Sequence, residues 1–167
     1  MDKTYEYISD NLFFKVFNAA NYRNGYEYDD GINDLRNYIG LDNKQFYCFF
    51  TDIKNIFYYL DYGPCFRQVL IPKNIPFVYT SKDCLDKETE VKEFYSDIIE
   101  LGSIMLWNTK NIKWLIENGA DISANNYYII EWSLMNNFEV FYFLQDYLGD
   151  TEIWLNKLKE LELRGFI

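Results

Sequence analysis

The stretch from Asn111 to Asn126, NIKWLIENGADISANN, constrains the fold more than any other part of the chain. Its apolar residues recur at helical spacing and predict a helix with one apolar face. That helix runs into Gly119, which can adopt the left-handed conformation that ends a helix, and then into the small Ala120. Because the apolar face has no partner within the stretch, neighbouring elements must cover it, as they do in stacked repeats.

The residues after position 93 continue the helical pattern on both sides of this stretch. Gly102-Ser103 supplies the small pair that close helix packing requires, and the C-terminal residues place charges between apolar positions. Such a last helix could close the open end of a stack with a polar outer face. We therefore expect further helices over Tyr95–Trp107, Tyr127–Met135, Val140–Leu148 and Thr151–Ile167.

The first 80 residues follow another pattern, in which aromatic and branched runs alternate with turn signals. Between two of these runs, Thr51-Asp52 can cap a helix that continues to Leu60 and ends at Gly63-Pro64. The most charged stretch of the chain follows at 81–93 and is typical of a linker or an exposed loop, and we expect the domain boundary there. The predicted strands lie at residues 12–17 (with a helix as the alternative), 26–28, 45–50, 65–71 and 76–80.

These patterns together predict an α+β fold with four parts. A small α+β N-terminal unit covers residues 1–80 and a charged linker covers 81–93. Helical hairpins follow over 94–149, and a C-terminal capping helix covers 150–167.

The net charge of the chain indicates which classes of partner it can bind. The chain has 16 basic and 26 acidic residues and a formal net charge of −10. A protein that binds the phosphate backbone needs a basic face, so we do not expect direct nucleic-acid binding. An acidic surface could instead meet a basic partner or mimic a nucleic acid, while the simplest interpretation is that the charge keeps the protein soluble.

Other features narrow the class of protein. The three cysteines are scattered, and the chain has no histidine, so a zinc site is not expected. Cys48 and Cys65 lie in apolar runs and are expected in the core, whereas Cys84 lies in the charged stretch. No signal peptide and no apolar run of membrane-spanning length is evident, which favours a soluble intracellular protein without membrane contact.

Two clusters of polar residues are candidates for a metal site or a catalytic site. Asp29, Asp30 and Asp34 lack the spacing of a calcium loop, so capped turns are favoured over a metal site. Thr51, Asp52 and Arg67 flank an aromatic strand. A catalytic site there would need a base and a nucleophile, but the chain has no histidine and no cysteine in a reactive setting.

A helix cap and an ion pair explain the second cluster more simply. A degenerate enzyme fold, with a cleft lined by Asp30, Thr51, Asp52 and Arg67, is the weaker alternative. We therefore predict no catalytic residues, no metal and no cofactor.

The sharpest candidates for a binding surface are Tyr127, Tyr128, Glu131 and Met135. They should line the first helix and turn of the second repeat, on the face with which stacked repeats commonly bind partners. The alternative is that the aromatic members belong to the core. A core or inter-repeat role is also expected for all four tryptophans, which are Trp107, Trp114, Trp132 and Trp154.

The sequence resembles a known family in two places. NIKWLIENGADISA and NNYYIIEWSLMNNFEVFYFL resemble two successive ankyrin repeats, within residues 94–149. NGYEYDDGIN, FFTDIKNIFYYLDYG and FRQVLIP resemble the region that precedes the repeats in ankyrin-repeat proteins of giant DNA viruses. The resemblance covers about residues 12–149 and identifies the chain as a short member of this type.

The resemblance implies about two ankyrin-type helical hairpins and a non-enzymatic protein–protein interaction module. Its partner would be a host or viral protein, in the host cytoplasm or in the virion. The alternative function is an acidic inhibitor or nucleic-acid mimic that blocks a basic site on a nucleic-acid-handling protein. A homodimer built on exposed aromatic residues is a further open alternative.

Overall fold

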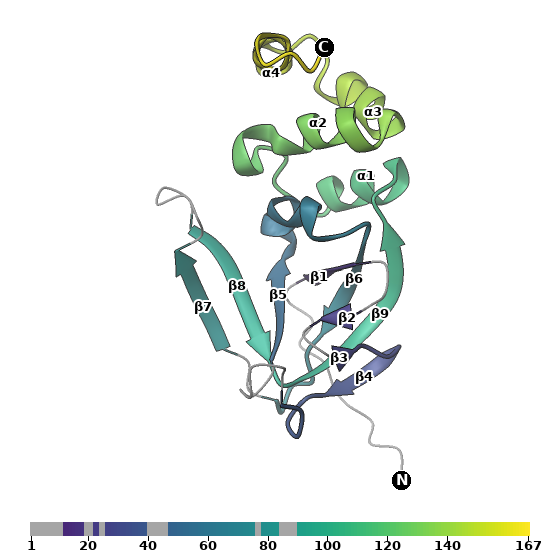
Figure 1. The fold of residues 1–167 in the computed structure, drawn as a ribbon, viewed down its shortest axis with the longest axis vertical. Helices are drawn as coiled ribbons and strands as arrows, with labels where there is room; N and C mark the ends of the chain where they lie inside the picture. Colours follow the sequence, from purple (N-terminus) through teal and green to yellow (C-terminus); the bar gives the residue numbers. More distant parts are fainter. Residues whose placement is uncertain (1–11, 19–21, 24–25, 40–46, 76–77, 84–89) are drawn as a thin grey trace.

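The computed structural model describes residues 12–18, 22–23, 26–39, 47–75, 78–83 and 90–167. An antiparallel sheet forms one end of the molecule, and the helices lie beyond the other end of that sheet (Figure 1). The sheet has seven strands in the order β4-β9-β6-β1-β5-β8-β7. Their bounds are β1 Phe13–Phe17, β4 Gly31–Asp34, β5 Cys48–Asp52, β6 Cys65–Leu70, β7 Val78–Asp83, β8 Glu90–Ser96 and β9 Ile98–Leu106.

The remaining elements are short or helical. Strands β2 and β3 form a separate two-stranded ribbon, and η1 is a 3-10 helix that packs against β1, β5 and α2. Helix α2 packs on α3, and α4 contacts both of them. Their bounds are β2 Tyr22–Arg23, β3 Tyr26–Glu27, η1 Ile53–Tyr62, α1 Thr109–Glu117, α2 Ala124–Asn136, α3 Phe138–Leu148 and α4 Glu152–Leu163.

Strand β1 lies at the centre of the sheet, and all five of its residues are buried. Successive side chains point to opposite faces of a strand, so this strand contributes to two cores. Phe14 and Val16 join the core that contains η1 and the helices, whereas Phe13 and Phe17 join a core on the opposite face. A central strand that is covered on both faces is therefore mostly apolar, as β1 is.

Two buried cations face the second core. Lys15 on β1 and Arg67 on β6 are directly opposite each other in the sheet register. Lys15 Nζ donates to the carbonyl of Phe49 at 2.9 Å. Arg67 donates from Nε to the carbonyl of Gly102 at 2.7 Å and from Nη2 to Asp30 Oδ1 at 2.6 Å. Burial of these charges is tolerated because each has carbonyl or carboxylate partners.

The helix cap predicted at Asp52 is confirmed, since its Oδ1 accepts a hydrogen bond from the Asn55 amide at 3.1 Å. The strands predicted at 12–17 and 65–71 are confirmed as β1 and β6. The helix predicted from Ile53 is present as a 3-10 helix. Parts of the predictions at 45–50 and 76–80 lie outside the described residues, as does Cys84.

The predicted fold class was wrong in its second half, although the α+β class itself fits. Residues 95–107 were expected to form a helix, but 95–96 end β8 and 98–106 form β9, and these strands pair with β5 and β6. Their β-branched residues Ile98, Ile99 and Ile104 suit a strand, and pairing with the sheet overrides the helical spacing. Ankyrin-type hairpins are consequently not evident in the structure.

The stretch after Gly119 also differs from a repeat. Asn125, Asn126 and Tyr127 have positive φ angles of 51°, 54° and 57°, so α2 begins with a left-handed turn. Helices are nevertheless present at α1, α2, α3 and α4, close to where periodicity placed them. The division into domains at 81–93 stays a prediction, although strands of the same sheet lie on both sides of it.

Gly63 is a position at which the backbone leaves no room for a side chain. A Cβ at this position would lie inside van der Waals contact of the Phe17 carbonyl, which is backbone and cannot swing away. We predict that Gly63→Ala lowers the free energy of unfolding by about 3 kcal/mol or more. Gly102→Ala is the matched control, because its Cβ would meet the Gln68 Cβ at an ordinary 3.5 Å.

Urea unfolding followed by circular dichroism measures both variants. Equal losses in the two would show that the close approach at residue 63 does not constrain the chain.

Candidate functional site

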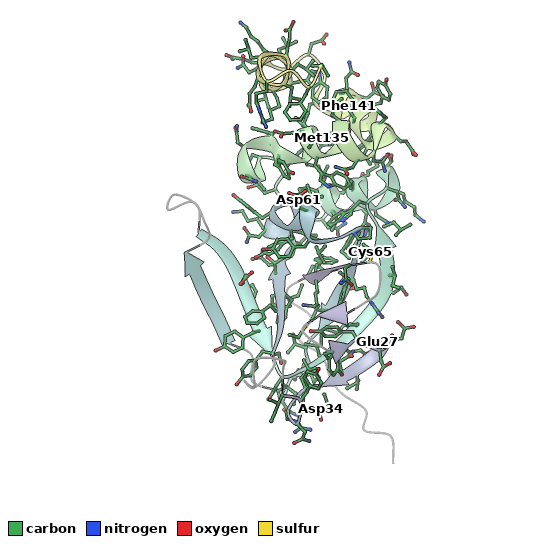
Figure 2. All side chains as sticks on the ribbon, in the orientation of Figure 1. Glu27, Asp34, Asp61, Cys65, Met135 and Phe141 are labelled. Atoms are coloured by element: carbon green, nitrogen blue, oxygen red, sulfur yellow. The ribbon has the colours of Figure 1, made fainter. Side chains whose placement is uncertain are left out.

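A cleft of about 570 Å³ lies where the sheet meets the helices. It is formed by the end of η1, the junction between β9 and α1, and the end of α2. Figure 2 shows Asp61 at this level and Met135 among the helices above it. The lining residues are Leu60, Asp61, Gly63, Pro64, Leu106, Trp107, Asn108, Trp132, Asn136 and Asn137.

Two tryptophans build the inner wall of the cleft. The Trp107 indole Nε1 donates to the carbonyl of Gly63 at 2.8 Å, which fixes the ring against the end of η1. Its ring centroid lies 4.3 Å from that of Phe66 and 6.2 Å from that of Trp132. Asn137 Nδ2 donates to the carbonyl of Trp107 at 3.0 Å and so ties the start of α3 to the same wall. The wall is therefore rigid and aromatic.

The rim of the cleft combines exposed apolar and polar groups. Leu106 is 56% exposed, although it is the last residue of a sheet strand. Asn136 donates from Nδ2 to the carbonyl of Trp132 at 2.9 Å, which leaves its side-chain oxygen as a further acceptor. Asn108 caps α1 by accepting from the Asn111 amide at 2.9 Å. No lysine or arginine is among the described residues that line the cleft.

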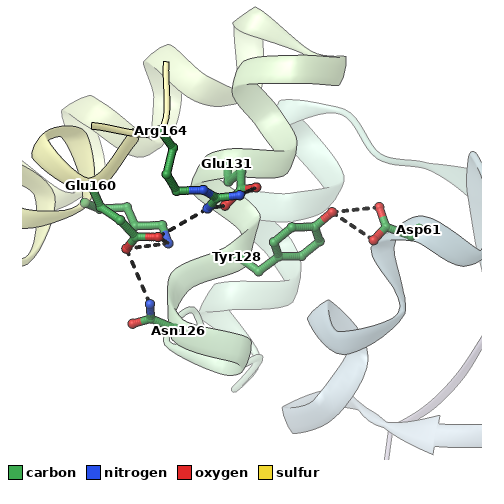
Figure 3. Close-up of polar contacts among 7 residues, drawn as sticks. Asp61, Asn126, Tyr128, Glu131, Glu160 and Arg164 are labelled. Carbon is green, nitrogen blue, oxygen red and sulfur yellow. Dashed lines mark hydrogen bonds and ion pairs between the residues drawn. The ribbon is translucent and has the colours of Figure 1, made fainter. Parts of the chain in front are cut away.

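Asp61 supplies the carboxylate of the cleft and accepts a hydrogen bond from Tyr128 on α2, beside the cleft. The Tyr128 hydroxyl lies 2.8 Å from one carboxylate oxygen of Asp61 and 3.0 Å from the other (Figure 3). Burial and then this hydrogen bond raise the pKa of Tyr128 to about 12, so the hydroxyl stays protonated at neutral pH. In the described part of the chain, no cation forms an ion pair with Asp61.

A second polar network joins α2 to the C-terminal helix α4. Glu131 is 7% exposed and accepts two hydrogen bonds from Arg164, at 2.5 and 2.8 Å (Figure 3). Arg164 also reaches Glu160 at 3.3 Å, and Lys157 bonds Glu160 at 3.0 Å. The hydrogen bond from Lys157 lowers the pKa of Glu160, and the bond to Glu131 raises the pKa of Arg164.

The four predicted partner-binding residues do not form one surface group. Tyr128 bonds Asp61 beside the cleft, and Glu131 is buried in the pair with Arg164. Tyr127 is half-buried and packs against the helix-side core, whereas Met135 is exposed. Their role in partner binding stays a prediction, but two of the four already have intramolecular contacts.

The aspartates weighed as a metal site are held by separate contacts. Asp30 pairs with Arg67, and Asp34 pairs with Arg36. The Asp29 amide donates to the side chain of the buried Asn33 at 2.9 Å. Within the described residues, no three potential metal-ligating groups converge.

Sequence reasoning missed the cleft residues for a simple reason. Trp107 and Trp132 were expected in the core, and both are largely buried there. Asp61 precedes Gly63-Pro64, which indicates only the end of a helix. Nothing local shows that residues 61, 107 and 136 lie together, because the long-range pairing of β6 with β9 and the packing of α2 on η1 create that proximity.

The known proteins that are similar to this chain include two of Acanthamoeba polyphaga mimivirus. One is named "Uncharacterized protein R869" and is 28% identical over 132 residues, which cover 76% of this chain and 91% of the relative. The other is named "Putative ankyrin repeat protein R868" and is 27% identical over 125 residues. This match covers 71% of this chain but only 59% of the relative, so the chain spans about three-fifths of that protein.

These relatives support a giant-virus origin for the chain. No model of a known protein family and no solved structure matches it. In the described residues, no helix combines the length and apolar character needed to cross a membrane.

Burial of Tyr128, together with its hydrogen bond to Asp61, makes the stability of the fold depend on pH in the alkaline range. The folded-state pKa of about 12 exceeds the reference value of 10.0, so the stabilisation is fully present below about pH 10 and is lost as pH rises through 12. We predict that Asp61→Asn moves the Tyr128 pKa back toward 10, as followed by ¹³C NMR of labelled tyrosine.

Tyr128→Phe assigns the resonance and lowers the free energy of unfolding at pH 7 by about 1 kcal/mol. An unchanged Tyr128 pKa in Asp61→Asn would contradict the contact.

The pair between Glu131 and Arg164 should fasten α4 to α2. We predict that Glu131→Gln lowers the thermal midpoint more than Glu162→Gln does, because Glu162 is an exposed residue of α4 and Glu131 is buried in the pair. Amide hydrogen exchange in α4 should rise in the first variant and stay unchanged in the second. Equal midpoints in the two variants would mean that the pair contributes nothing to docking of the helix.

Proposed function

We propose that this chain is a non-enzymatic protein-interaction module that binds a segment of a host or viral protein in the cleft. The observation that carries the proposal is the cleft itself. Its volume of about 570 Å³ is in the range of binding sites, and its wall consists of two fixed tryptophans. Tryptophan is a common anchor of protein interfaces. The name of one relative, a putative ankyrin repeat protein, agrees loosely with an interaction role.

The chemistry of the lining favours binding over catalysis. Its polar side chains are one carboxylate and three amides, and amides do not titrate near neutral pH. General acid–base catalysis is most efficient when the catalytic pKa lies near the working pH, and the neighbouring Tyr128, with a pKa of about 12, is far from it. The cleft therefore offers an anchor surface and hydrogen bonds, which suit an extended segment of a partner.

Two leucines provide a matched test. Leu106 is 56% exposed at the rim of the cleft, and Leu155 is 53% exposed on α4. We predict that Leu106→Glu reduces recovery of the partner about tenfold or more in affinity purification from infected cells. Leu155→Glu should recover the partner as well as the unchanged chain does. Quantitative mass spectrometry measures both, and equal recovery with the two variants would place the partner elsewhere on the molecule.

The same pair of variants separates the cleft from the alternative of an acidic inhibitor or nucleic-acid mimic. Mimicry depends on the summed surface charge and weakens steeply with salt. Leu106→Glu adds one negative charge, so a mimic would keep or gain affinity for a basic partner. A segment seated in the cleft would instead lose its apolar contact.

A further inference from the structure

We infer that the cleft takes a lysine or arginine side chain of the protein partner, with its cation on Asp61 and its hydrocarbon stem along the apolar wall. The inference rests on the proposed function and names the chemistry of the occupant. Four features of the cleft carry it, and each of them concerns the described residues.

The first feature is the unused capacity of the Asp61 carboxylate. An ionised carboxylate offers about four acceptor sites, and a tyrosine hydroxyl donates a single hydrogen. The Tyr128 hydroxyl lies within hydrogen-bond distance of both oxygens, so one donor is shared between them. Most of the acceptor capacity of Asp61 therefore remains for a group that carries several N–H donors, as an ammonium or a guanidinium does.

The second feature is that this carboxylate is preorganised. Asp61 lies in the last turn of η1, and Tyr128 reaches it from α2. Helix α2 is itself packed against η1 and held to α4 by the Glu131–Arg164 pair. A carboxylate that is already oriented loses less freedom when it binds a cation, which favours affinity.

The third feature is the apolar wall beside the charge. Leu60, Pro64 and the exposed Leu106 line the same cleft as Asp61, together with the two tryptophans. Lysine and arginine bury their hydrocarbon stems along apolar surface while the charged end stays at the rim. The combination of a stem-sized apolar wall and a carboxylate at its rim fits these two side chains.

The fourth feature is the sign of the charge. The carboxylate of Asp61 is the only charged group among the described lining residues, and the side-chain oxygen of Asn136 adds an acceptor. An acidic side chain would meet like charge without a compensating cation. The net charge of −10 on the whole chain further raises the local concentration of a basic segment.

Selection from a random peptide library tests the inference without knowledge of the natural partner. The full chain, Asp61→Asn and Asp146→Asn are each used as bait. The second variant removes the same charge from an exposed residue of α3 and is the control. The unchanged chain and Asp146→Asn should enrich peptides that carry lysine or arginine beside an apolar residue, and Asp61→Asn should lose the preference for the basic residue.

The location and the contact are then measured with a selected peptide. In ¹H–¹⁵N NMR spectra, the indole N–H signals of Trp107 and Trp132 should shift more than those of Trp114 and Trp154. Asp61→Asn, or replacement of the basic peptide residue by Gln, should each weaken binding about tenfold or more. The two changes together should cost little more than either alone, because both remove one contact.

Tyr128→Phe keeps the charge but releases the carboxylate, and should weaken binding less than Asp61→Asn does. Peptides that shift the two cleft tryptophans without any basic residue, or fully additive losses in the double change, would overturn the inference and leave the proposed function standing. If no selected peptide shifts these two signals, both the inference and the proposed function fail.

Discussion

The antiparallel pairing of β9 with β6 is the interaction on which the rest of the structure depends. It places Leu106 opposite Cys65, so the next residue, Trp107, meets the carbonyl of Gly63 at the same end of this pair of strands. The chain leaves the sheet at this point and enters α1. The wall of the cleft is therefore a direct consequence of strand register, and a shift by one residue would turn each side chain of β9 to the opposite face.

The same pairing explains how the sheet tolerates charge in its second core. The register between β6 and β9 is irregular between Arg67 and Val69, and the Arg67 guanidinium reaches the carbonyl of Gly102 on β9. Asp30 comes from the loop before β4 and pairs with the same guanidinium. One buried arginine thereby links the centre of the sheet to β9 and to the segment that leads into its edge strand. An apolar side chain at this position could fill the space but could not hold the loop.

The sequence predicted the local elements well and the long-range arrangement poorly. Aromatic density predicted β1, and apolar spacing predicted α1 and α3, because these signals come from neighbouring residues. Ile98 to Leu106 failed because its spacing suits a helix face as well as a buried strand, and only the partner strand β6 decides between them. Gly102, interpreted as a close-packing residue of a helix, lies in a strand beside Gln68.

The candidate site was partly predictable for the same reason. Tyr128 and Glu131 were predicted to bind a partner, which stays a prediction, but the residues that they contact within the chain, Asp61 and Arg164, are 67 and 33 residues away. No local pattern encodes contacts of that separation. The residues that became the cleft were assigned to the core, which is where most of the surface of Trp107 lies.

The carboxylates of Glu131 on α2 and of Asp61, which bonds Tyr128 on α2, differ in whether a cation balances their charge. Tyr128 and Glu131 are three positions apart and therefore lie on neighbouring parts of one helix face. Glu131 has its charge balanced by Arg164 in a buried pair, whereas the described residues offer Asp61 the neutral hydroxyl of Tyr128 and no ion pair. Balancing Asp61 with a cation of this chain would have stabilised the joint between η1 and α2 and closed the cleft to a charged ligand. Because the chain uses a tyrosine there instead, the joint is fixed in place while the charge remains available to a partner.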